Sequence, residues 1–452
     1  MSTPRSLVLP SFLAAALLAA AASPATAWTP VDGDARRAVV EAELDAAVAG
    51  LDAELRREKL DAMAPNAFTF VRATAGLYHR DLLESGAVAA SPFHIDAVTW
   101  LQGDAHVRNV GVFADDGGEV VFGFDDFDQA WPGSYLVDVW RMASTLVLFA
   151  DRADVPSAAD RAARAFAESY VDAVLDFAAG HGEIDHQLTR DTARAPARRL
   201  ILETLDEEGP KEMLGEWTRG KKDKRRFRAH GDLRDLDGGA ARRLVDAVGR
   251  YAESLDGFDG GYFRVKDVAR RVKAGIGSRG VDRFYVLVEG PPGGRDVILD
   301  IKAQAARPSL ARLFPPLPAM PGAGCRVARA EVVMLNRADR HLGCLEMAGQ
   351  SFSVRPRNPF KKSMKAKKID GAKDLVALAR DLGRVLAAGH SRADDDAEDS
   401  GVDASFDDAF AAAVAGEARR RAFVDEVAAF ADGYARQVAA DYRLFLDWRR
   451  RP

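Results

Sequence analysis

The stretch from Val265 to Ala305 constrains the fold of this chain most strongly, because its pattern predicts a sheet. Its sequence, VKDVARRVKAGIGSRGVDRFYVLVEGPPGGRDVILDIKAQA, alternates β-rich runs with a Gly-rich turn and a Pro-Gly turn. We expect three antiparallel strands here. Apolar residues at helical spacing dominate the sequence on both sides of it. The chain is therefore expected to be an α+β protein in which a small β module interrupts helical regions.

The length of the chain predicts more than one compact unit. It has 452 residues, whereas a single hydrophobic core usually stops growing at roughly 250–300 residues. We expect residues 28–260 to form a helical lobe that contains a hairpin. Residues 261–360 are expected to form a small β lobe, and residues 361–452 a helical part that packs back on the first lobe.

Local patterns predict individual elements within these parts. The helices expected from periodicity are Asp34–Leu60, Phe68–Leu83, Asp138–Ala150, Ser157–Ala179, Arg326–Arg337 and most of the chain after Asp374. The strands expected outside the β module are Val110–Phe113 and Val120–Phe124, joined by a turn, and one or two more between Cys344 and Val354.

Charge and cysteine content argue against two classes of function. Lys and Arg number 63 against 68 Asp and Glu, a net charge of -5, so no nucleic-acid partner is expected. Cys325 and Cys344 are the two cysteines. They are too few for a disulfide scaffold and lack the paired spacing of a structural zinc site.

The first residues have the pattern of a cleavable secretory signal. Arg5 precedes an apolar run from Leu7 to Ala22, and Ala25-Thr26-Ala27 follows as a small-residue cleavage site. An anchor helix is the alternative, but the run is shorter than the roughly 20 residues that span a bilayer. We expect residues 1–27 to be removed and the protein to be exported to the periplasm or beyond, with no membrane span left. Cys325 and Cys344 could then form one bridge.

Oxygen-bearing side chains gather in two neighbouring turns. Gly103-Asp104-Ala105-His106-Val107-Arg108-Asn109 contains an Asp-x4-Asn spacing, and Asp125, Asp126 and Asp128 follow a predicted strand. Carboxylates and a carboxamide are the ligands of hard cations such as Mg²⁺. The same spacing serves phosphoryl transfer, in which the Asp receives the acceptor proton and the Asn holds metal. The alternative is that these side chains only cap turns. His106 is as well suited to fixing the loop as to contacting a ligand, and Asp138 is expected to cap a helix or bind the loop backbone.

A second group of residues lies in the β module. The Gly-rich turn from Gly275 to Gly280 stands between two strands, which disfavours a dinucleotide site and is compatible with a hairpin that covers phosphates. Lys302 lies in the third strand, where a lysine usually has a fixed anionic partner. Glu331 is the candidate carboxylate. A plain hairpin with a surface lysine is the alternative.

Taken together, these residues resemble the bacterial family called domain of unknown function 2252, and through it the protein-kinase-like and aminoglycoside-phosphotransferase-like fold. The likeness is carried by Phe70-Val71-Arg72, Gly103-Asp104-Ala105-His106-x-x-Asn109, Asp126-Phe127-Asp128, Asp138, Ala274-Gly275-Ile276-Gly277-Ser278, Lys302, Gly389-His390-Ser391-Arg392 and Tyr434-Ala435-x-Gln437-x-x-x-Asp441.

The resemblance implies a two-lobed kinase-like fold with a large helical lobe and a small antiparallel β lobe. It would be circularly permuted, because the Asp104 segment precedes the Gly-rich turn. In this comparison Asp104 is the catalytic residue. Metal would be held by Asn109, Asp126 and Asp128, and a nucleotide by Gly275, Gly277, Ser278, Gly280 and Lys302.

Three functions fit these features. The first is a phosphotransferase that uses Mg²⁺ and ATP or another nucleoside triphosphate to modify a small molecule or a protein, whose identity the sequence does not give. The second is a catalytically inactive, kinase-like ligand-binding protein outside the cytoplasm, where ATP is scarce. The third, a metal-dependent hydrolase, is weaker because no His-rich ligand set accompanies the acidic residues.

Overall fold

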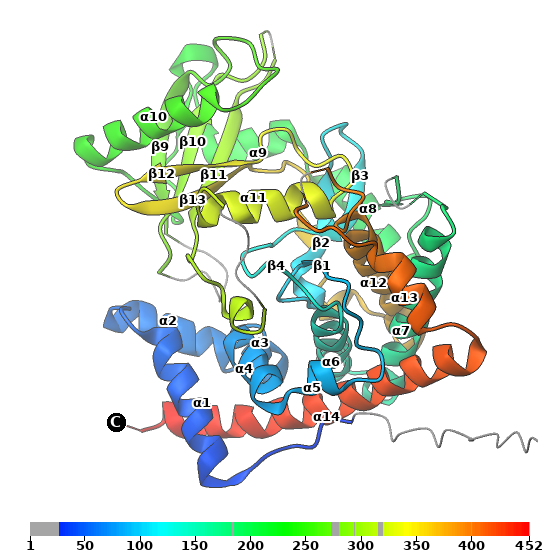
Figure 1. Ribbon diagram of the computed structural model, residues 1–452. Coiled ribbons are helices and arrows are strands. Elements are labelled where there is room, and N and C mark those ends of the chain that lie inside the picture. The colour runs from blue at the N-terminus through cyan, green and yellow to red at the C-terminus, as the bar shows by residue number, and fades with distance from the viewer. Residues whose placement is uncertain are drawn as a thin grey trace, which may run out of the picture.

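The computed structural model combines helices with antiparallel sheets, as expected for an α+β protein (Figure 1). It describes residues 27–182, 185–272, 280–292, 294–314, 320–398 and 400–451. Nearly all of the expected signal (residues 1–26) and the Gly-rich turn residues Gly275, Gly277 and Ser278 lie outside the described residues. No described helix is long and apolar enough to cross a membrane.

Most helices belong to one large assembly, here called the helical body, which is defined by the residues of the largest hydrophobic cluster. Its helices are α1 (Gly33–Val48), α2 (Ala53–Met63), α3 (Ala67–Val71), α4 (Ala75–Ser85), α5 (Ala87–Ala90), α6 (Leu136–Arg152), α7 (Ala159–Ala178), α8 (Ala195–Glu207), α12 (Ala372–Arg392), α13 (Phe406–Ala413) and α14 (Glu417–Arg449). The helix expected from Asp34 to Leu60 is two helices, because the chain turns at Gly50 with φ +75°. The one expected over Phe68–Leu83 is also two.

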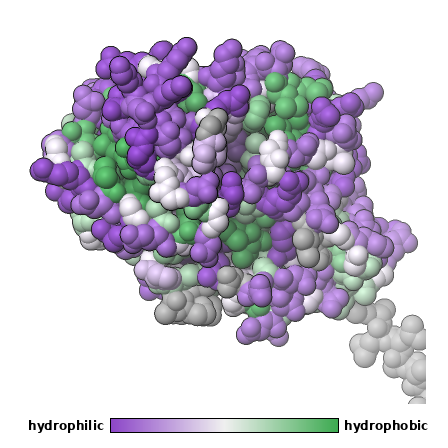
Figure 2. Space-filling view, turned by 90° about the horizontal axis from the view of Figure 1, so that it is seen from above, coloured by the Kyte–Doolittle hydropathy of each residue, from purple (hydrophilic) through white to green (hydrophobic). Residues whose placement is uncertain are grey.

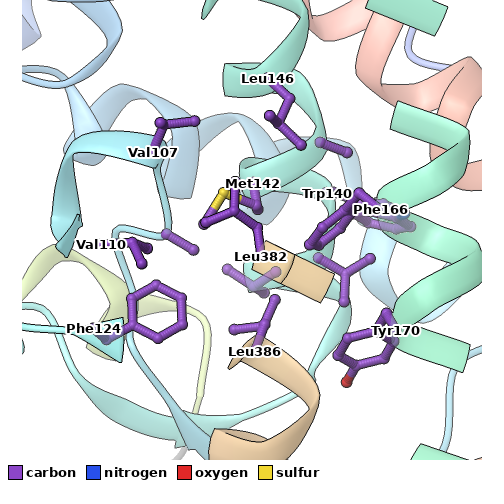
Figure 3. Packing of buried hydrophobic residues seen from close by; sticks show 14 of the residues in the cluster. Val107, Val110, Phe124, Trp140, Met142, Leu146, Phe166, Tyr170, Leu382 and Leu386 are labelled. Carbon is purple, nitrogen blue, oxygen red and sulfur yellow. The ribbon is translucent and has the colours of Figure 1, made fainter. Parts of the chain in front are cut away.

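Two small sheets lie in the helical body. One pairs β1 (Thr99–Leu101) with β4 (Trp131–Gly133), and the other has the order β14 (Lys362–Ser363), β2 (Val110–Ala114), β3 (Val120–Phe124), β5 (Leu188–Thr189). The predicted hairpin is confirmed as β2 and β3. Figure 3 shows Val110 and Phe124 of this hairpin beside Met142 of α6 and Leu382 and Leu386 of α12. The hairpin and the turns at its ends are therefore anchored on two long buried helices.

A six-stranded antiparallel sheet stands at the other end of the molecule (Figure 1). Its order is β12 (Gly343–Met347), β13 (Gln350–Pro356), β11 (Val297–Ala303), β10 (Arg283–Val288), β9 (Val265–Arg271) and β8 (Leu233–Arg234). The three strands predicted from Val265 onward are confirmed as β9, β10 and β11. We call this sheet with α9 (Pro210–Trp217), α10 (Gly238–Glu253) and the hairpin β6 (Thr218–Arg219)–β7 (Arg226–Phe227) the β module. The face of the molecule seen from above is mainly hydrophilic, with separate hydrophobic patches (Figure 2).

The two faces of this sheet have different environments, because successive side chains of a strand point to opposite faces. On one face α10 packs its Leu244 and Val248 against Val286 and Ile301. On the other, Trp217 of α9 packs against neighbours that include Ile298. The sequence-based division placed α9 and α10 with the helical lobe, but both pack on the sheet.

The side chains of β11 that point to the second face of the sheet change from apolar to charged along the strand. Asp300 and Lys302 follow Ile298 at two-residue steps, so this face passes from apolar side chains to charged ones. Helix α11 (Ala323–Met334) packs against β13 and also contributes Val327 and Met334 to the core of the helical body. The Cys325–Cys344 disulfide ties α11 to β12. The charged part of the sheet and α11 therefore face the hairpin of the helical body.

Candidate functional site between the hairpin and the sheet

The Asp104 turn begins where two backbone amides bind a buried carboxylate. The N–H groups of Gln102 and Gly103 donate to Asp138 at 2.6 and 2.9 Å. This confirms the expectation that Asp138 binds the loop backbone. Gly103 has φ +81°, and a Cβ there would lie 2.3 Å from the carbonyl oxygen of Gln129. The residue before Asp104 is therefore a glycine for both conformational and steric reasons.

Asp104 is held by an arginine of α6. The Nε of Arg141 donates to Oδ1 of Asp104 at 2.6 Å, and Nε2 of His106 lies 3.7 Å from Oδ2. Burial raises the pKa of Asp104 to about 6, although Arg141 opposes this shift. A carboxyl group in this range is ionised at neutral pH and still basic enough to accept a proton.

His106 and Asn109 fix the shape of the turn. The Asn109 backbone N–H donates to Nδ1 of His106 at 3.0 Å, and Nδ2 of Asn109 donates to the carbonyl oxygen of Asp104 at 3.1 Å. Burial, followed by the charges of Arg72 and Arg141, lowers the pKa of His106 well below its usual value. Neutral His106 is therefore a structural acceptor in this loop.

The second turn, from Asp125 to Asp128, lies beside the first. The Asp125 N–H donates to the carbonyl oxygen of Asn109 at 3.1 Å. Gln102, which the sequence reasoning missed, joins the turns: its Oε1 accepts from the Asp104 N–H at 2.9 Å and its Nε2 donates to the carbonyl oxygen of Asp126. The sequence signal that pointed to Gln102 was its position directly before Gly103-Asp104.

The carboxylates of Asp126 and Asp128 have different surroundings. Among the described residues, none donates a hydrogen bond to the Asp126 carboxylate or forms an ion pair with it. Burial and the nearby Asp128 raise the pKa of Asp126. Asp128 instead pairs with Lys302 and accepts from Nε2 of Gln304 at 2.9 Å. Burial disfavours its charge, but Lys302 and Gln304 outweigh burial and lower the pKa of Asp128.

The partner of Lys302 is thus Asp128, and the candidate partner Glu331 is wrong. Glu331 pairs with Arg355 of β13 at 2.9 Å, and Arg355 also donates to the carbonyl oxygen of Asp125 at 2.6 Å. The Glu331 carboxylate and the Arg355 guanidinium therefore lie between the sheet and the second turn.

Arg326 of α11 is a further residue that the sequence reasoning missed. It donates to the carbonyl oxygens of Asp128 at 3.0 Å and Ala130 at 2.5 Å. It follows Cys325 directly, so the disulfide and the turn are connected through two adjacent residues. A single arginine inside a helix gives no sequence signal for this role.

A cavity of about 380 Å³ opens between the β2–β3 hairpin and the sheet. Phe113, Phe124 and Tyr285 give it apolar walls. Its charged walls are formed by Arg271, Arg283, Arg337, Arg355, Arg357 and Lys361 and by Asp115, Asp125, Asp300, Glu331 and Asp339. A smaller cavity beside Asp126, Asp128 and Lys302 shares Arg283, Asp300, Glu331 and Arg355 with it. We call the two together the cleft. Most of these cations already face a carboxylate: Arg283 pairs with Asp300, Arg355 with Glu331 and Lys361 with Asp125. An aromatic wall beside charged groups of both signs is suited to a ligand that combines a flat ring with polar groups.

The predicted site residues therefore separate into three groups. Asp104, Asn109, Asp126, Asp128 and Lys302 lie in the two turns and on the strand above them. Gly280 lies apart, where a Cβ would meet Cδ2 of Leu51 at 2.4 Å. Gly275, Gly277 and Ser278 are outside the described residues.

Comparisons with known proteins give one result. No curated protein and no solved structure matches the chain. A family model described as an uncharacterized protein conserved in bacteria, DUF2252, matches residues 51–448. This match covers most of the sequence, from α2 to the end of α14. The chain therefore belongs to the DUF2252 family of bacterial proteins.

Proposed function

We propose that this protein is a phosphotransferase that binds a nucleoside triphosphate in the cleft and transfers its terminal phosphoryl group to an acceptor beside Asp104. The observation that carries the proposal is the contact of Lys302 with Asp128. It joins two segments 174 residues apart in the sequence, to which the resemblance assigned a metal and the phosphates of a nucleotide. A permuted kinase-like arrangement, in which the sheet with Lys302 covers the turn with Asp126, accounts for this contact.

Chemically, Asp104 supplies the proton acceptor. Its pKa of about 6 leaves it ionised at neutral pH, so it can take the proton of an acceptor hydroxyl as that oxygen attacks phosphorus. Arg141 fixes one carboxylate oxygen, and the other accepts no hydrogen bond among the described residues. Lys302, now paired with Asp128, would bind donor phosphate oxygens.

The residues present fit a magnesium ion in part. Among the described residues, the Asp126 carboxylate has no hydrogen-bonding or ionic partner. Among the same residues, Oδ1 of Asn109 accepts no hydrogen bond. Asp128 is already neutralised by Lys302. The described chain holds no group of three or more His, Cys, Asp or Glu arranged for a metal. Mg²⁺ usually takes one or two protein oxygens and completes its shell with phosphate and water. Asp126 and Asn109 would therefore hold it, and the ion would neutralise charge on the phosphates.

The experiment is a phosphoryl-transfer and hydrolysis assay of the chain from Trp28 onward, with Mg²⁺ and ATP. Asp104→Asn should abolish turnover while leaving nucleotide binding intact. An unchanged rate in this variant would refute the proposed role.

The disulfide supports a second candidate function. Cys325 and Cys344 are bonded, and such bonds persist mainly in oxidising compartments. This supports the proposal that the leader exports the protein to the periplasm or beyond, where ATP is scarce. A ligand-binding protein without catalysis is then the second candidate. Calorimetry that shows nucleotide binding without turnover would favour it, and turnover would exclude it.

A further inference from the structure

The β6–β7 hairpin of the β module carries a concentrated and exposed positive charge. Residues 219–228 read RGKKDKRRFR, and their one carboxylate, Asp223, pairs with Arg264 of a neighbouring segment. Among the described residues, six exposed cations of this run form no ion pair with a carboxylate. We call these six the basic cluster: Arg219, Lys221, Lys222, Lys224, Arg226 and Arg228. The whole chain has a net charge of -5, so the cluster is a local excess of cations that the protein itself does not neutralise.

A second basic run in the same chain does have carboxylate partners. Residues 361–368 read KKSMKAKK, and three of these five lysines form ion pairs. The pairs are Lys361 with Asp125, Lys362 with Glu203 and Glu207, and Lys368 with Glu203. The lack of such partners within the described ranges is therefore a property of the basic cluster and not of every basic run in this chain.

The hairpin has two features that cost stability. Arg219 of β6 is the register partner of Arg226 of β7, and like charges at directly opposite positions destabilise a sheet. Nη1 of Arg226 donates to the carbonyl oxygens of Asp223 and Arg225 at 2.8 and 2.7 Å, which are neutral groups. Lys222 has φ +50°, a left-handed conformation that is unfavourable for a residue with a side chain. A bound anionic surface would compensate for the repulsion between the two arginines.

Buried groups fix the hairpin to the sheet. Lys266 of β9, whose side chain is 1% exposed, pairs with Asp296 at 2.8 Å and donates to the carbonyl oxygen of Lys222 at 3.2 Å. Asp296 also pairs with Arg225 at 2.8 Å. Phe227 is buried in the core that α9 shares with the sheet. The basic cluster is therefore presented on a hairpin that the fold holds in place.

The other side chains of the hairpin favour a lipid surface as the partner. A protein partner usually docks on a large apolar side chain, but the large hydrophobic residues that are exposed in the described chain all lie outside residues 210–236. Single-stranded nucleic acid stacks on exposed aromatic rings, whereas Phe227 is buried. Clusters of about four to eight Lys and Arg bind anionic lipid surfaces through charge alone. The disulfide supports export, and an exported protein meets membranes rather than chromosomal nucleic acid.

We propose that the basic cluster docks this protein on a membrane surface that contains anionic phospholipids. Phosphates of the lipid headgroups would lie between the lysine and arginine side chains. The contact would be reversible and sensitive to salt, because charge alone holds it. In the described structure, neither cavity of the cleft is lined by residues of the basic cluster. Docking and ligand binding therefore use separate surfaces, and this inference does not depend on the proposed function.

The test is co-sedimentation of the chain from Trp28 onward with two kinds of vesicle, at about 0.1 M salt, where the Debye length is about 10 Å. One kind contains phosphatidylcholine alone, and the other contains phosphatidylcholine and phosphatidylglycerol. The hairpin variant is Arg219→Gln/Lys221→Gln/Lys224→Gln. It removes three cations whose side chains form no hydrogen bond in the part of the chain that the structure describes, so the fold of the hairpin should be retained.

The control variant is Arg161→Gln/Arg420→Gln/Arg443→Gln, which removes three exposed cations from α7 and α14 of the helical body. Both variants change the net charge equally. We expect wild type to bind only the vesicles with phosphatidylglycerol, and to bind them more weakly at about 0.5 M salt. The hairpin variant should bind about a hundredfold more weakly, at about 1 kcal/mol for each cation. The control variant should bind like wild type.

Four results would overturn the inference. They are no binding to either kind of vesicle, equal binding to both kinds, equal weakening by the two triple variants, and tighter binding of a DNA duplex or of polyglutamate than of the anionic vesicles at the same salt. The last result would make the partner a nucleic acid or an acidic protein. Melting temperatures show whether the variants fold. If the hairpin variant does not, Lys221→Gln and Lys224→Gln are measured singly, and each should weaken binding about fivefold.

Discussion

Lys302 of β11 forms an ion pair with Asp128, which follows β3 at the edge of the helical body. The pair links the charged end of the sheet to the turn that carries Asp126. Gln304, two residues along the chain from Lys302, donates to the same carboxylate at 2.9 Å and to the Ser353 hydroxyl at 2.9 Å. Two polar contacts, from Lys302 and Gln304 to Asp128, thus join the sheet to the turn at the narrow end of the cleft, and the contact with Ser353 fixes Gln304 on the sheet.

The pH dependence of turnover should follow Asp104. Because a base must be ionised, the rate should rise with pH through an apparent pKa near 6 and level off above about pH 7. Arg141→Gln removes the cation that favours ionisation, so the rise should move to higher pH by about one unit. The control is Arg152→Gln, at the exposed end of the same helix. Identical pH profiles for Arg141→Gln and wild type would contradict the assignment.

Gly103 and Gly118 offer a matched pair of substitutions. Both have positive φ, +81° and +83°, so alanine strains either backbone by about 1 kcal/mol. At Gly118 a Cβ meets nothing within 4 Å, whereas at Gly103 it would lie 2.3 Å from the Gln129 carbonyl oxygen. We therefore expect Gly103→Ala to lower the free energy of unfolding clearly more than Gly118→Ala, as measured by denaturant titration. Equal losses of the free energy of unfolding would contradict the close packing of Gly103 against the Gln129 carbonyl group.

The Arg283–Asp300 pair should stabilise the sheet where it lines the cleft. Burial alone would raise the pKa of Asp300, but the paired guanidinium holds it well below its usual range. Arg283→Met leaves this carboxylate charged and unpaired, which should cost about 3 kcal/mol at pH 7. Because burial raises the pKa of Asp300 once Arg283 is gone, the cost should begin to shrink above about pH 4 and should fall further as the pH drops below it. The double variant Arg283→Met/Asp300→Leu should recover most of the loss. A double variant as unstable as the single one would contradict this account.

The disulfide should stabilise the fold and hold α11 in place. It closes a loop with a sequence separation of 19, for which chain entropy gives about 3 kcal/mol. Cys325→Ser/Cys344→Ser should therefore lower the melting temperature, and a reductant should lower that of wild type but not that of the variant. Because Arg326 holds the Asp128 turn, the variant should also bind nucleotide more weakly. Wild type that is insensitive to reductant after complete reduction would refute the stabilising role.

Sequence reasoning predicted the local features of this protein and missed those that depend on distant contacts. The β2–β3 hairpin follows from residues near one another in the chain and was predicted. Binding of the loop backbone by Asp138, across 35 and 36 residues, was one of two roles expected for it. The partner of Lys302 was not, because Asp128 and Glu331 are both plausible until the sheet is placed against the turn. Helix α10 has a clear apolar side, but its periodicity does not say which core that side joins. Gln102 and Arg326 act through backbone carbonyls and amides, for which a sequence carries no pattern.

The most direct test of the account is the melting temperature of the chain from Trp28 onward, with and without Mg²⁺ and ATP. Ligands that bind only the folded state raise it by mass action. We predict a clear rise with both ligands present that is lost in Asp126→Asn and kept in Asp116→Asn, an exposed acid in the turn of the same hairpin. No rise with any nucleoside triphosphate, or a rise that Asp126→Asn leaves unchanged, would contradict the claim that the cleft binds nucleotide and metal beside Asp126.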